Sequence, residues 1–204
     1  MVKIYNCEQK SEEWYKCRLG KLTASVAHTI ATAGKGLDTL CLEKATEILT
    51  GIIPDGFTNE AMQHGNEFEA EARNIYELET CYTVKQVGFV EDNEYVGVSP
   101  DGLIGDDGLI EIKCPQEKTY TEYLIDMKIK PEYYAQMQMQ MLITKRIWCD
   151  YVVYNSHFEK PIIIQRVFPD KEYMEKLAEG LGYGIRRIQE IVKQVQANMR
   201  LKNE

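Results

Sequence analysis

The sequence predicts an α/β fold in which one central mixed β-sheet is flanked by helices on both sides. Three observations predict it. Helical periodicity fills the first 80 residues and then changes to short, β-branched or alternating segments. A further helical stretch separates these segments from two more strand-like ones, residues 147–154 and 161–168. The resulting order of helices, strands, helices, strands and a final helix is typical of a sheet covered on both faces.

The first helices are predicted from their caps. Ser11 can cap a short helix that runs to about Leu19 and ends at Gly20. A second short helix is expected near Ser25, which we interpret as its N-cap, and residues 34–36 are expected to be a flexible loop because two glycines flank a lysine there.

Two longer helices are expected over residues 37–50 and 59–79. Gly51 and Pro54 close the first of them. The second carries an apolar stripe with helical spacing, formed by Met62, Gly65, Phe68, Ala72, Ile75 and Tyr76.

The middle of the chain is predicted to hold a three-stranded meander over residues 82–90, 94–98 and 108–113, because Asp, Asn and Gly turns separate these segments. Helices are expected at 116–128 and from Pro131, a favoured first helical residue, to about Lys145. The last helix spans 170 to about 200, with an interruption at Gly180-Leu181-Gly182. A chain of 204 residues lies within the size of one domain, so residues 1–204 are expected to form a single domain.

The charge balance limits how this protein could bind nucleic acid. Its 24 basic and 32 acidic residues give a formal net charge of −8, whereas a chain held on nucleic acid by a broad basic surface would be cationic. The acidity is uneven, because residues 55–111 have a net charge of −12 and the rest of the chain has +4. The balance therefore excludes a broad basic surface but not nucleic-acid binding.

The six cysteines are widely scattered and contain no CxxC pair, so neither a disulfide framework nor a zinc site is expected, and reduced thiols favour the cytoplasm. There is no run of about 18 apolar residues, so no membrane span is expected. The N-terminus lacks an apolar core of the kind found in signal peptides, so secretion is not expected.

The most informative pattern is Ser99-Pro100-Asp101-Gly102 followed by Leu109-Ile110-Glu111-Ile112-Lys113. Side chains alternate along a strand, so Ile110 and Ile112 share one face while Glu111 and Lys113 share the other. The turn at residues 102–108 would fold Asp101 back beside Glu111.

Two adjacent carboxylates repel each other unless a cation bridges them, and hard oxygen ligands suit Mg2+ or Mn2+. Lys113, close to such a cation, could orient or deprotonate an attacking water, or neutralise charge that develops on a phosphate. The alternative is a solvated strand face that carries a Glu111–Lys113 pair, with Asp101-Gly102 as a plain turn.

Asp101…Glu111-Ile112-Lys113 resembles the PD-(D/E)xK motif of the restriction-endonuclease-like nuclease superfamily. Within that superfamily the chain, from Trp14 to about residue 175, is similar to the phage lambda exonuclease and YqaJ-type viral recombinase family. Five blocks carry the resemblance in order and spacing: Arg18-Leu19-Gly20-Lys21-Leu22-Thr23-Ala24-Ser25, Gly65-x-x-x-Glu69, Ser99-Pro100-Asp101-Gly102, Glu111-Ile112-Lys113-Cys114-Pro115 and Ala135-Gln136-x-Gln138.

The resemblance implies a restriction-endonuclease-like core and a 5′→3′ exonuclease that digests one strand of linear duplex DNA with Mg2+. Asp101, Glu111 and the carbonyl of Ile112 would hold one ion, Asp101 would bridge to a second with Glu69 nearby, and Lys113 would serve the nucleophilic water. Glu69 also borders the apolar stripe of its helix, although an ordinary boundary glutamate would do the same.

Arg18, Ser25 and Ser99 match family residues that hold the 5′-phosphate, and a helix N-terminus at Ser25 would favour such an anion. A helix cap and a surface arginine are the alternative. The chain departs from the family pattern at Thr119, where the family has an arginine that contacts the phosphate. The neighbouring Lys118 could supply the positive charge, but a lysine cannot make the two parallel hydrogen bonds of a guanidinium.

The family places Gln136 beside the active site as a polar contact. Gln138 and Gln140 fit equally well in a half-buried amphipathic helix. His28, His64 and His157 show no ligand spacing and are interpreted as structural or exposed.

Family resemblance further implies a homotrimeric ring, a single-strand annealing protein as partner, and a phage or prophage origin in the cytoplasm of a bacterial host. Two alternatives remain open: another nuclease of the superfamily, such as an endonuclease, and a DNA-end-binding protein without catalysis. The presence of Asp101, Glu111 and Lys113 together counts against the second.

Overall fold

The computed structural model describes residues 2–53 and 60–201, with the side chains of residues 60–67 and 201 left out. Its helices are α1 (Glu12–Arg18), the 3-10 turn η1 (Ala24–Val26), α2 (Ala27–Thr32), α3 (Lys35–Thr50), α4 (Glu60–Thr80), α5 (Glu117–Asp126), α6 (Pro131–Thr144) and α7 (Lys171–Leu201). Its strands are β1 (Lys3–Tyr5), β2 (Leu22–Thr23), β3 (Val84–Lys85), β4 (Phe89–Asn93), β5 (Val96–Val98), β6 (Gly102–Ile104), β7 (Gly108–Lys113), β8 (Trp148–Tyr154) and β9 (Ile162–Val167).

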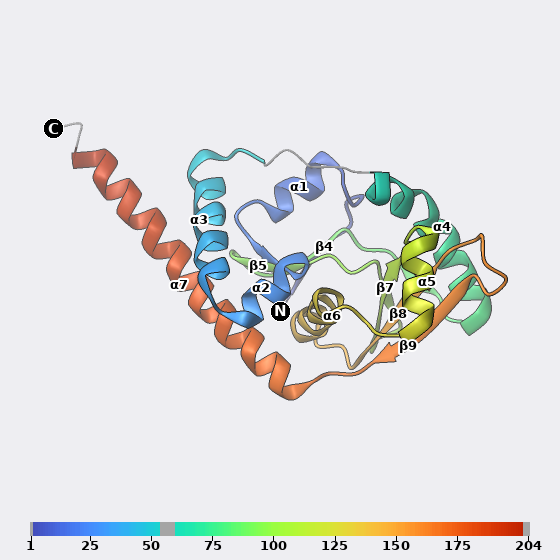
Figure 1. Ribbon diagram of the computed structural model, residues 1–204. Coiled ribbons are helices and arrows are strands. Elements are labelled where there is room, and N and C mark those ends of the chain that lie inside the picture. Colours follow the sequence, from blue (N-terminus) through green and yellow to red (C-terminus); the bar gives the residue numbers. More distant parts are fainter. Residues whose placement is uncertain (1, 54–59, 202–204) are drawn as a thin grey trace.

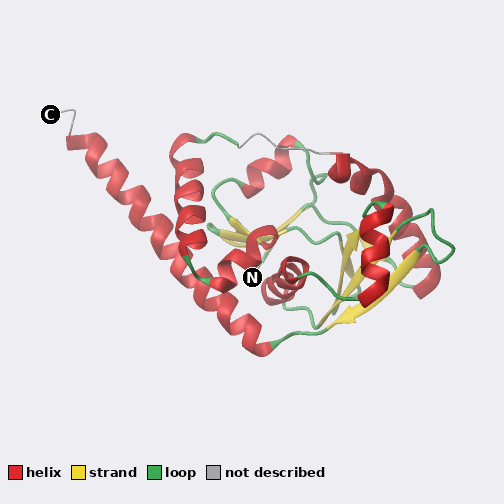
Figure 2. Cartoon of the chain, in the orientation of Figure 1, coloured by secondary structure: helices red, strands yellow, loops and turns green. Residues whose placement is uncertain are grey.

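These strands form two mixed sheets with helices around them, as Figure 2 shows. One sheet has the order β1-β4-β5-β2 and the other β3-β6-β7-β8-β9, and the described parallel pairs are β2/β5 and β7/β8. The prediction of one sheet with a three-stranded meander was therefore wrong. The chain enters the second sheet at β3, returns to the first for β4 and β5, and crosses again at β6. Strands β1, β2, β3 and β6 are too short to show an alternating pattern.

Helix α6 lies between the two sheets, in contact with β4 and β5 on one side and with β8 on the other (Figure 1). Helix α4 packs on the opposite face of the five-stranded sheet, against β7, β8 and β9. Ile110 and Ile112 share a buried cluster with Ala72 and Tyr76 of α4. The predicted alternation in this strand is therefore confirmed, and Glu111 faces α6.

The hairpin of β6 and β7 positions the acidic residues. Its register pairs Gly102 with Ile110 and Ile104 with Gly108. Asp101 directly precedes β6 and Glu111 directly follows Ile110, so the turn brings the two carboxylates to the same end of the hairpin. This agrees with the expectation from the sequence.

Several helix ends were predicted correctly. The Ser11 side chain accepts the Trp14 N–H at 3.2 Å and caps α1. Helix α3 ends before Gly51, whose φ of 67° lies in the left-handed region that favours glycine. Pro131 is the first residue of α6. Pro54 and the stripe residues Met62 and Gly65 lie outside the described side chains.

Three local predictions were wrong. Ser25 lies inside the turn η1, whose N-cap is Thr23. Residues 34–36 are not a loop, because Gly34 caps α3 and the helix starts at Lys35. Helix α7 continues through Gly180, where a Cβ atom would lie 2.2 Å from the Ile30 carbonyl oxygen, so this glycine permits close packing on α2 rather than a break.

Helix α7 packs along α2 and α3, and its C-terminal part projects from the body of the protein (Figure 1). Among the described residues, no helix combines the length and apolar character needed to cross a membrane.

Candidate active site

A cleft of about 580 Å³ opens where the hairpin end, helix α6 and the N-terminal elements meet. Most of the candidate side chains line this cleft, in one group at each of its ends. Those at one end are Glu69, Asp101, Glu111, Lys113 and Gln136, and those at the other are Arg18, Ser25 and Ser99.

Asp101 is fixed by the backbone of the neighbouring strand. Its Oδ2 accepts the N–H of Ile112 at 2.7 Å. Burial raises the pKa of Asp101 well above its ordinary value, and the negative charges of Glu111 and Glu69 raise it further, although Lys113 and the Ile112 N–H act in the opposite direction. The predicted crowding of carboxylates is therefore present.

Glu111 is almost fully buried, with 1% exposure, and is held by three side chains. Its Oε1 accepts the Gln136 Nε2 at 2.7 Å and also the Lys113 ammonium. Its Oε2 accepts the Gln140 Nε2 at 2.7 Å. A buried polar group needs hydrogen-bond partners, so the two glutamines satisfy this carboxylate and fix its orientation.

Lys113 lies between the carboxylates and an aromatic ring. Its Nζ contacts Glu111 and lies 4.9 Å from the centroid of the Tyr133 ring. Burial lowers the pKa of Lys113, but the charges of Glu111 and Asp101 together outweigh it, so the net direction is upward. Without a metal, the ammonium is therefore the charged partner of the acidic pair.

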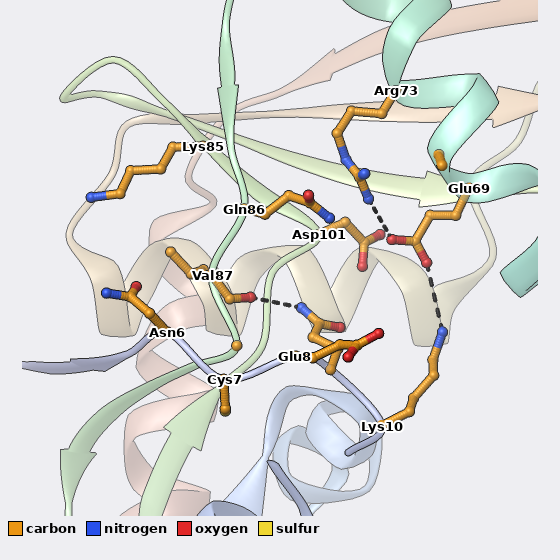
Figure 3. A pocket seen from close by; sticks show the side chains of 13 residues that line it. Asn6, Cys7, Glu8, Lys10, Glu69, Arg73, Lys85, Gln86, Val87 and Asp101 are labelled. Atoms are coloured by element: carbon orange, nitrogen blue, oxygen red, sulfur yellow. Dashed lines mark hydrogen bonds and ion pairs between the residues drawn. The ribbon is translucent and has the colours of Figure 1, made fainter. Parts of the chain in front are cut away.

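Glu69 reaches the same place from α4 but is held by two cations, as the dashed lines in Figure 3 show. Its Oε1 lies 2.7 Å from Arg73 Nη2, and its Oε2 lies 3.7 Å from Lys10 Nζ. Its side chain is 25% exposed, in keeping with the predicted position at the border of the buried stripe.

The donors at this end fit a hard divalent cation. They are carboxylate oxygens, and after burial the negative charges of Glu111 and Glu69 contribute to the raised pKa of Asp101, an unfavourable contact that a bound cation would relieve. Among the residues that the structure describes, no three Asp, Glu, His or Cys side chains are already gathered closely enough to hold a metal ion. Because Glu69 pairs with Arg73 and Lys10, metal binding through it requires these ion pairs to loosen.

At the other end of the cleft, Arg18 is surrounded by neutral groups. Its Nη2 lies 3.2 Å from both Thr23 Oγ1 and Ser25 Oγ, and its Nη1 lies 3.4 Å from Ser99 Oγ. The guanidinium stacks on Trp14 at 4.2 Å from the ring centroid, and Trp14 Nε1 donates to Ser99 Oγ at 2.9 Å.

Burial lowers the pKa of Arg18 to about 10. Within the part of the chain that the structure describes, Arg18 forms no salt bridge. A desolvated cation with hydroxyl groups beside it is a suitable partner for an anion such as a phosphate.

Lys118, proposed from the sequence as a replacement for the missing arginine, is exposed and does not line the cleft. Thr119 and Lys130 do line it. Lys130 directly precedes α6. The cation that lines the cleft here is therefore Lys130 and not Lys118, the residue that the sequence suggested.

Gln138 and His157, also considered from the sequence, do not line the cleft and contact other parts of the fold. Gln138 Nε2 donates to the Phe168 carbonyl at 2.9 Å, and its Oε1 accepts the Asp170 N–H at 2.8 Å. His157 Nδ1 contacts Glu117 at 2.6 Å on the surface. The side chain of His64 lies outside the described residues.

Sequence reasoning missed Gln140, Tyr133, Trp14 and Arg73. The shared helical face of Gln136 and Gln140 was the available signal for Gln140, and the four-residue spacing from Glu69 was the signal for Arg73. The same four-residue spacing within α1 was the signal for Trp14 beside Arg18. Tyr133 had no local signal, because its contact with Lys113 is made across the fold.

Known structures resemble this chain over nearly its whole length. A crystal structure of an alkaline exonuclease (LHK-Exo) from Laribacter hongkongensis has a TM-score of 0.86 at 34% identity, covering 93% of this chain and 98% of that one, and the same protein in complex with dAMP matches equally well. A phage-related exonuclease from Haemophilus somnus 129PT has a TM-score of 0.64 at 16% identity, over 86% and 96% of the two chains, and shows the fold alone.

A viral protein is also similar. "Uncharacterized protein R354" of Acanthamoeba polyphaga mimivirus is 27% identical over 167 residues, which is 74% of this chain but 30% of that protein. The chain thus spans less than a third of the length of this relative.

A family model, the YqaJ-like viral recombinase domain, matches residues 13–146, which include all the candidate residues of the cleft. Together with the likeness to the alkaline exonuclease, this match confirms the predicted mixed α/β fold of the PD-(D/E)xK type. The chain belongs to the family of YqaJ-like viral recombinase domains.

Proposed function

We propose that this protein is a Mg2+-dependent exonuclease that digests one strand of linear double-stranded DNA in the 5′→3′ direction from a 5′-phosphorylated end. The product would be a 3′ single-stranded overhang for homologous recombination by strand annealing. One observation carries the proposal: a single cleft holds an acidic cluster with a lysine at one end and, at the other, an arginine whose hydrogen-bond partners among the described residues are hydroxyl groups. The 34% identity to an alkaline exonuclease supports the reaction class.

The two ends have separate tasks in this proposal. Arg18, with Ser25 and Ser99, binds the terminal 5′-phosphate, because the guanidinium has hydroxyl neighbours and no carboxylate within ion-pair distance among the described residues. Lys113 holds or accepts a proton at its Nζ beside the attacking water, and Glu111 with Gln136 keeps it in place.

The acidic end would hold the metal. Asp101, Glu111, the carbonyl of Ile112 and Glu69 are the proposed ligands of two Mg2+ ions, for which Mn2+ can substitute. Bound there, the cations supply charge stabilisation to the scissile phosphate and acidify the nucleophilic water.

We also propose a homotrimeric ring, a single-strand annealing protein as partner and activity in the bacterial cytoplasm. These follow from the resemblance to lambda-type exonucleases. Light scattering coupled to size-exclusion chromatography tests the trimer, which would have three times the 23.6 kDa mass of the chain.

The substrate test compares three DNAs, each with Mg2+ or with EDTA: linear duplex with 5′-phosphate, the same duplex with 5′-hydroxyl, and a covalently closed circle. We expect digestion of linear DNA only, faster with the 5′-phosphate, and none in EDTA. Cleavage of the closed circle would show an endonuclease instead. Tight end binding without cleavage in Mg2+ would show a DNA-end-binding protein.

A further inference from the structure

A second hollow of about 790 Å³ adjoins the active-site cleft (Figure 3). Four residues line both cavities: Gln9, Lys10, Glu69 and Asp101. Arg18, Ser25 and Ser99 line the cleft but not the hollow, and the same is true of Glu111 and Lys113. Two members of the acidic cluster, Asp101 and Glu69, therefore lie where the two cavities join.

The far part of this hollow has the chemistry of a backbone-binding groove. Its wall includes Lys85 from β3 and the amides of Asn6 and Gln86. Lys85 is exposed, and it takes part in no salt bridge among the residues that the structure describes. Arg73, by contrast, is already committed to Glu69. Lys10, which also lines the hollow, pairs with the same glutamate. Among the described cations of the hollow, Lys85 can therefore contact a phosphate, and the amides can serve phosphate or sugar oxygens.

A continuous strand needs an exit from the acidic cluster. If the proposed function holds, the 5′-phosphate lies at Arg18 and the scissile phosphodiester at Asp101 and Glu111. The rest of the strand, which carries a negative charge at every linkage, must then leave on another side. The hollow that shares Asp101 and Glu69 with the cleft is an opening of sufficient size, since binding cavities commonly measure about 300–1,000 Å³.

We propose that this hollow binds the DNA strand on the 3′ side of the scissile phosphodiester, with Lys85 contacting a backbone phosphate. The proposal rests on the proposed exonuclease function, because that function sets the direction of the strand. It assigns to the hollow a substrate contact that is separate from metal binding and from capture of the 5′-phosphate.

The test measures binding to DNA that remains intact. In a Lys113→Ala background with Mg2+, fluorescence anisotropy follows binding to 5′-phosphorylated linear duplexes. One duplex is unmodified, and three carry a single uncharged methylphosphonate at the second, third or fourth linkage from the 5′ end, since the first linkage is the scissile one.

Adding Lys85→Ala should weaken binding to unmodified DNA about two- to fivefold, the range of one exposed charge contact. It should also reduce the slope of log affinity against log salt by about one. The effect of Lys85→Ala should disappear on one of the three methylphosphonate duplexes, because the charge it contacts is then absent. Lys85→Glu should show the same linkage dependence with a larger loss.

Lys171→Ala is the matched control, because this lysine is 91% exposed on α7 and should leave binding unchanged. Equal effects of Lys85→Ala on all four DNAs, or no effect at all, would overturn the proposal even if unaltered protein cleaves the duplex. Absence of cleavage by unaltered protein would refute the exonuclease itself, and with it the assumed direction of the strand.

Discussion

The two ends of the cleft differ in how their charges are balanced. At the acidic end, the two glutamates already have cationic partners within the protein: Glu111 has Lys113, together with two glutamines, and Glu69 has Arg73 and Lys10. At the other end, Arg18 has hydroxyl groups and a Trp14 ring around it. The first end is arranged to keep carboxylates close together, and the second is arranged to receive an anion.

The two ends also differ in how their residues are spaced along the chain. Carboxylates that must lie together on a hairpin need a fixed spacing along the chain, whereas the hydroxyl groups around Arg18 come from two separate segments, residues 23–25 and Ser99. Predictions that alter one end without the other can therefore test whether the two tasks are separate.

The largest effect is expected from removing the reacting groups. Asp101→Asn or Lys113→Ala should abolish DNA cleavage, with a loss of at least about 10³-fold in rate, because each removes charge at the reacting phosphate. Binding to 5′-phosphorylated ends should survive, since Arg18 is untouched. A near-normal cleavage rate in Lys113→Ala would mean that the active site lies elsewhere.

The next effect concerns the other end. Arg18→Ala should lower the preference for 5′-phosphate over 5′-hydroxyl DNA by about 10- to 100-fold, which corresponds to one charged hydrogen-bonding partner at 1.5–3 kcal/mol. Initial rates on both substrates measure this preference. The Mg2+ concentration for half-maximal rate should stay unchanged, and a shift in it would show that the two ends are not independent.

A smaller effect is expected from the glutamine that holds Glu111. Gln140→Met should reduce the cleavage rate by about 10-fold, the lower bound for groups that orient metal ligands. Gln138→Met is the matched control, because Gln138 is equally buried on the same helix but bonds the backbone near Phe168.

Both methionine variants should lose thermal stability, since each breaks a buried hydrogen bond worth about 1 kcal/mol. The rate at saturating Mg2+ should fall only in Gln140→Met. Equal rate losses in the two variants would mean that Gln140 acts through the fold alone.

The last prediction concerns stability at the acidic end. Burial, with Glu111 and Glu69, raises the pKa of Asp101 in the folded protein, so in the metal-free state this group stabilises the fold at low pH and loses that contribution as pH rises from its unfolded pKa through the higher folded one. Asp101→Asn should therefore raise the melting temperature of metal-free protein at neutral pH.

Differential scanning calorimetry in EDTA measures this change. Adding Mg2+ should raise the melting temperature of the unaltered protein more than that of the Asp101→Asn variant. A fall in melting temperature in EDTA on Asp101→Asn would contradict the repulsion on which the metal assignment rests.

The features that were predictable from the sequence depend on neighbours along the chain. The alternation of Ile110, Glu111 and Ile112 is a property of one strand, and the Ser11 cap is a property of one helical turn. These predictions were confirmed because local physics decides them.

The features that were missed depend on contacts across the fold. Gly180 was expected to break the helix, and only the structure shows that it allows the Ile30 carbonyl to pack against α7. The short segments β1 and β2 are strands because they pair with β4 and β5. Gln140 is informative only once Glu111 is seen to face α6. Contacts between distant parts of the chain therefore determine the structure at positions where the local sequence pattern fits more than one conformation.

The most direct test of the account is the polarity of digestion. A linear duplex carries a 5′-terminal [32P]phosphate and a 3′ fluorophore on the same strand, and both labels are followed over time in Mg2+ with unaltered protein and with Lys113→Ala. The account predicts early release of the 5′ label as a mononucleotide, late loss of the 3′ label, and no release by Lys113→Ala. Release of the 3′ label first, or internal cuts that separate the labels on long fragments, would contradict it.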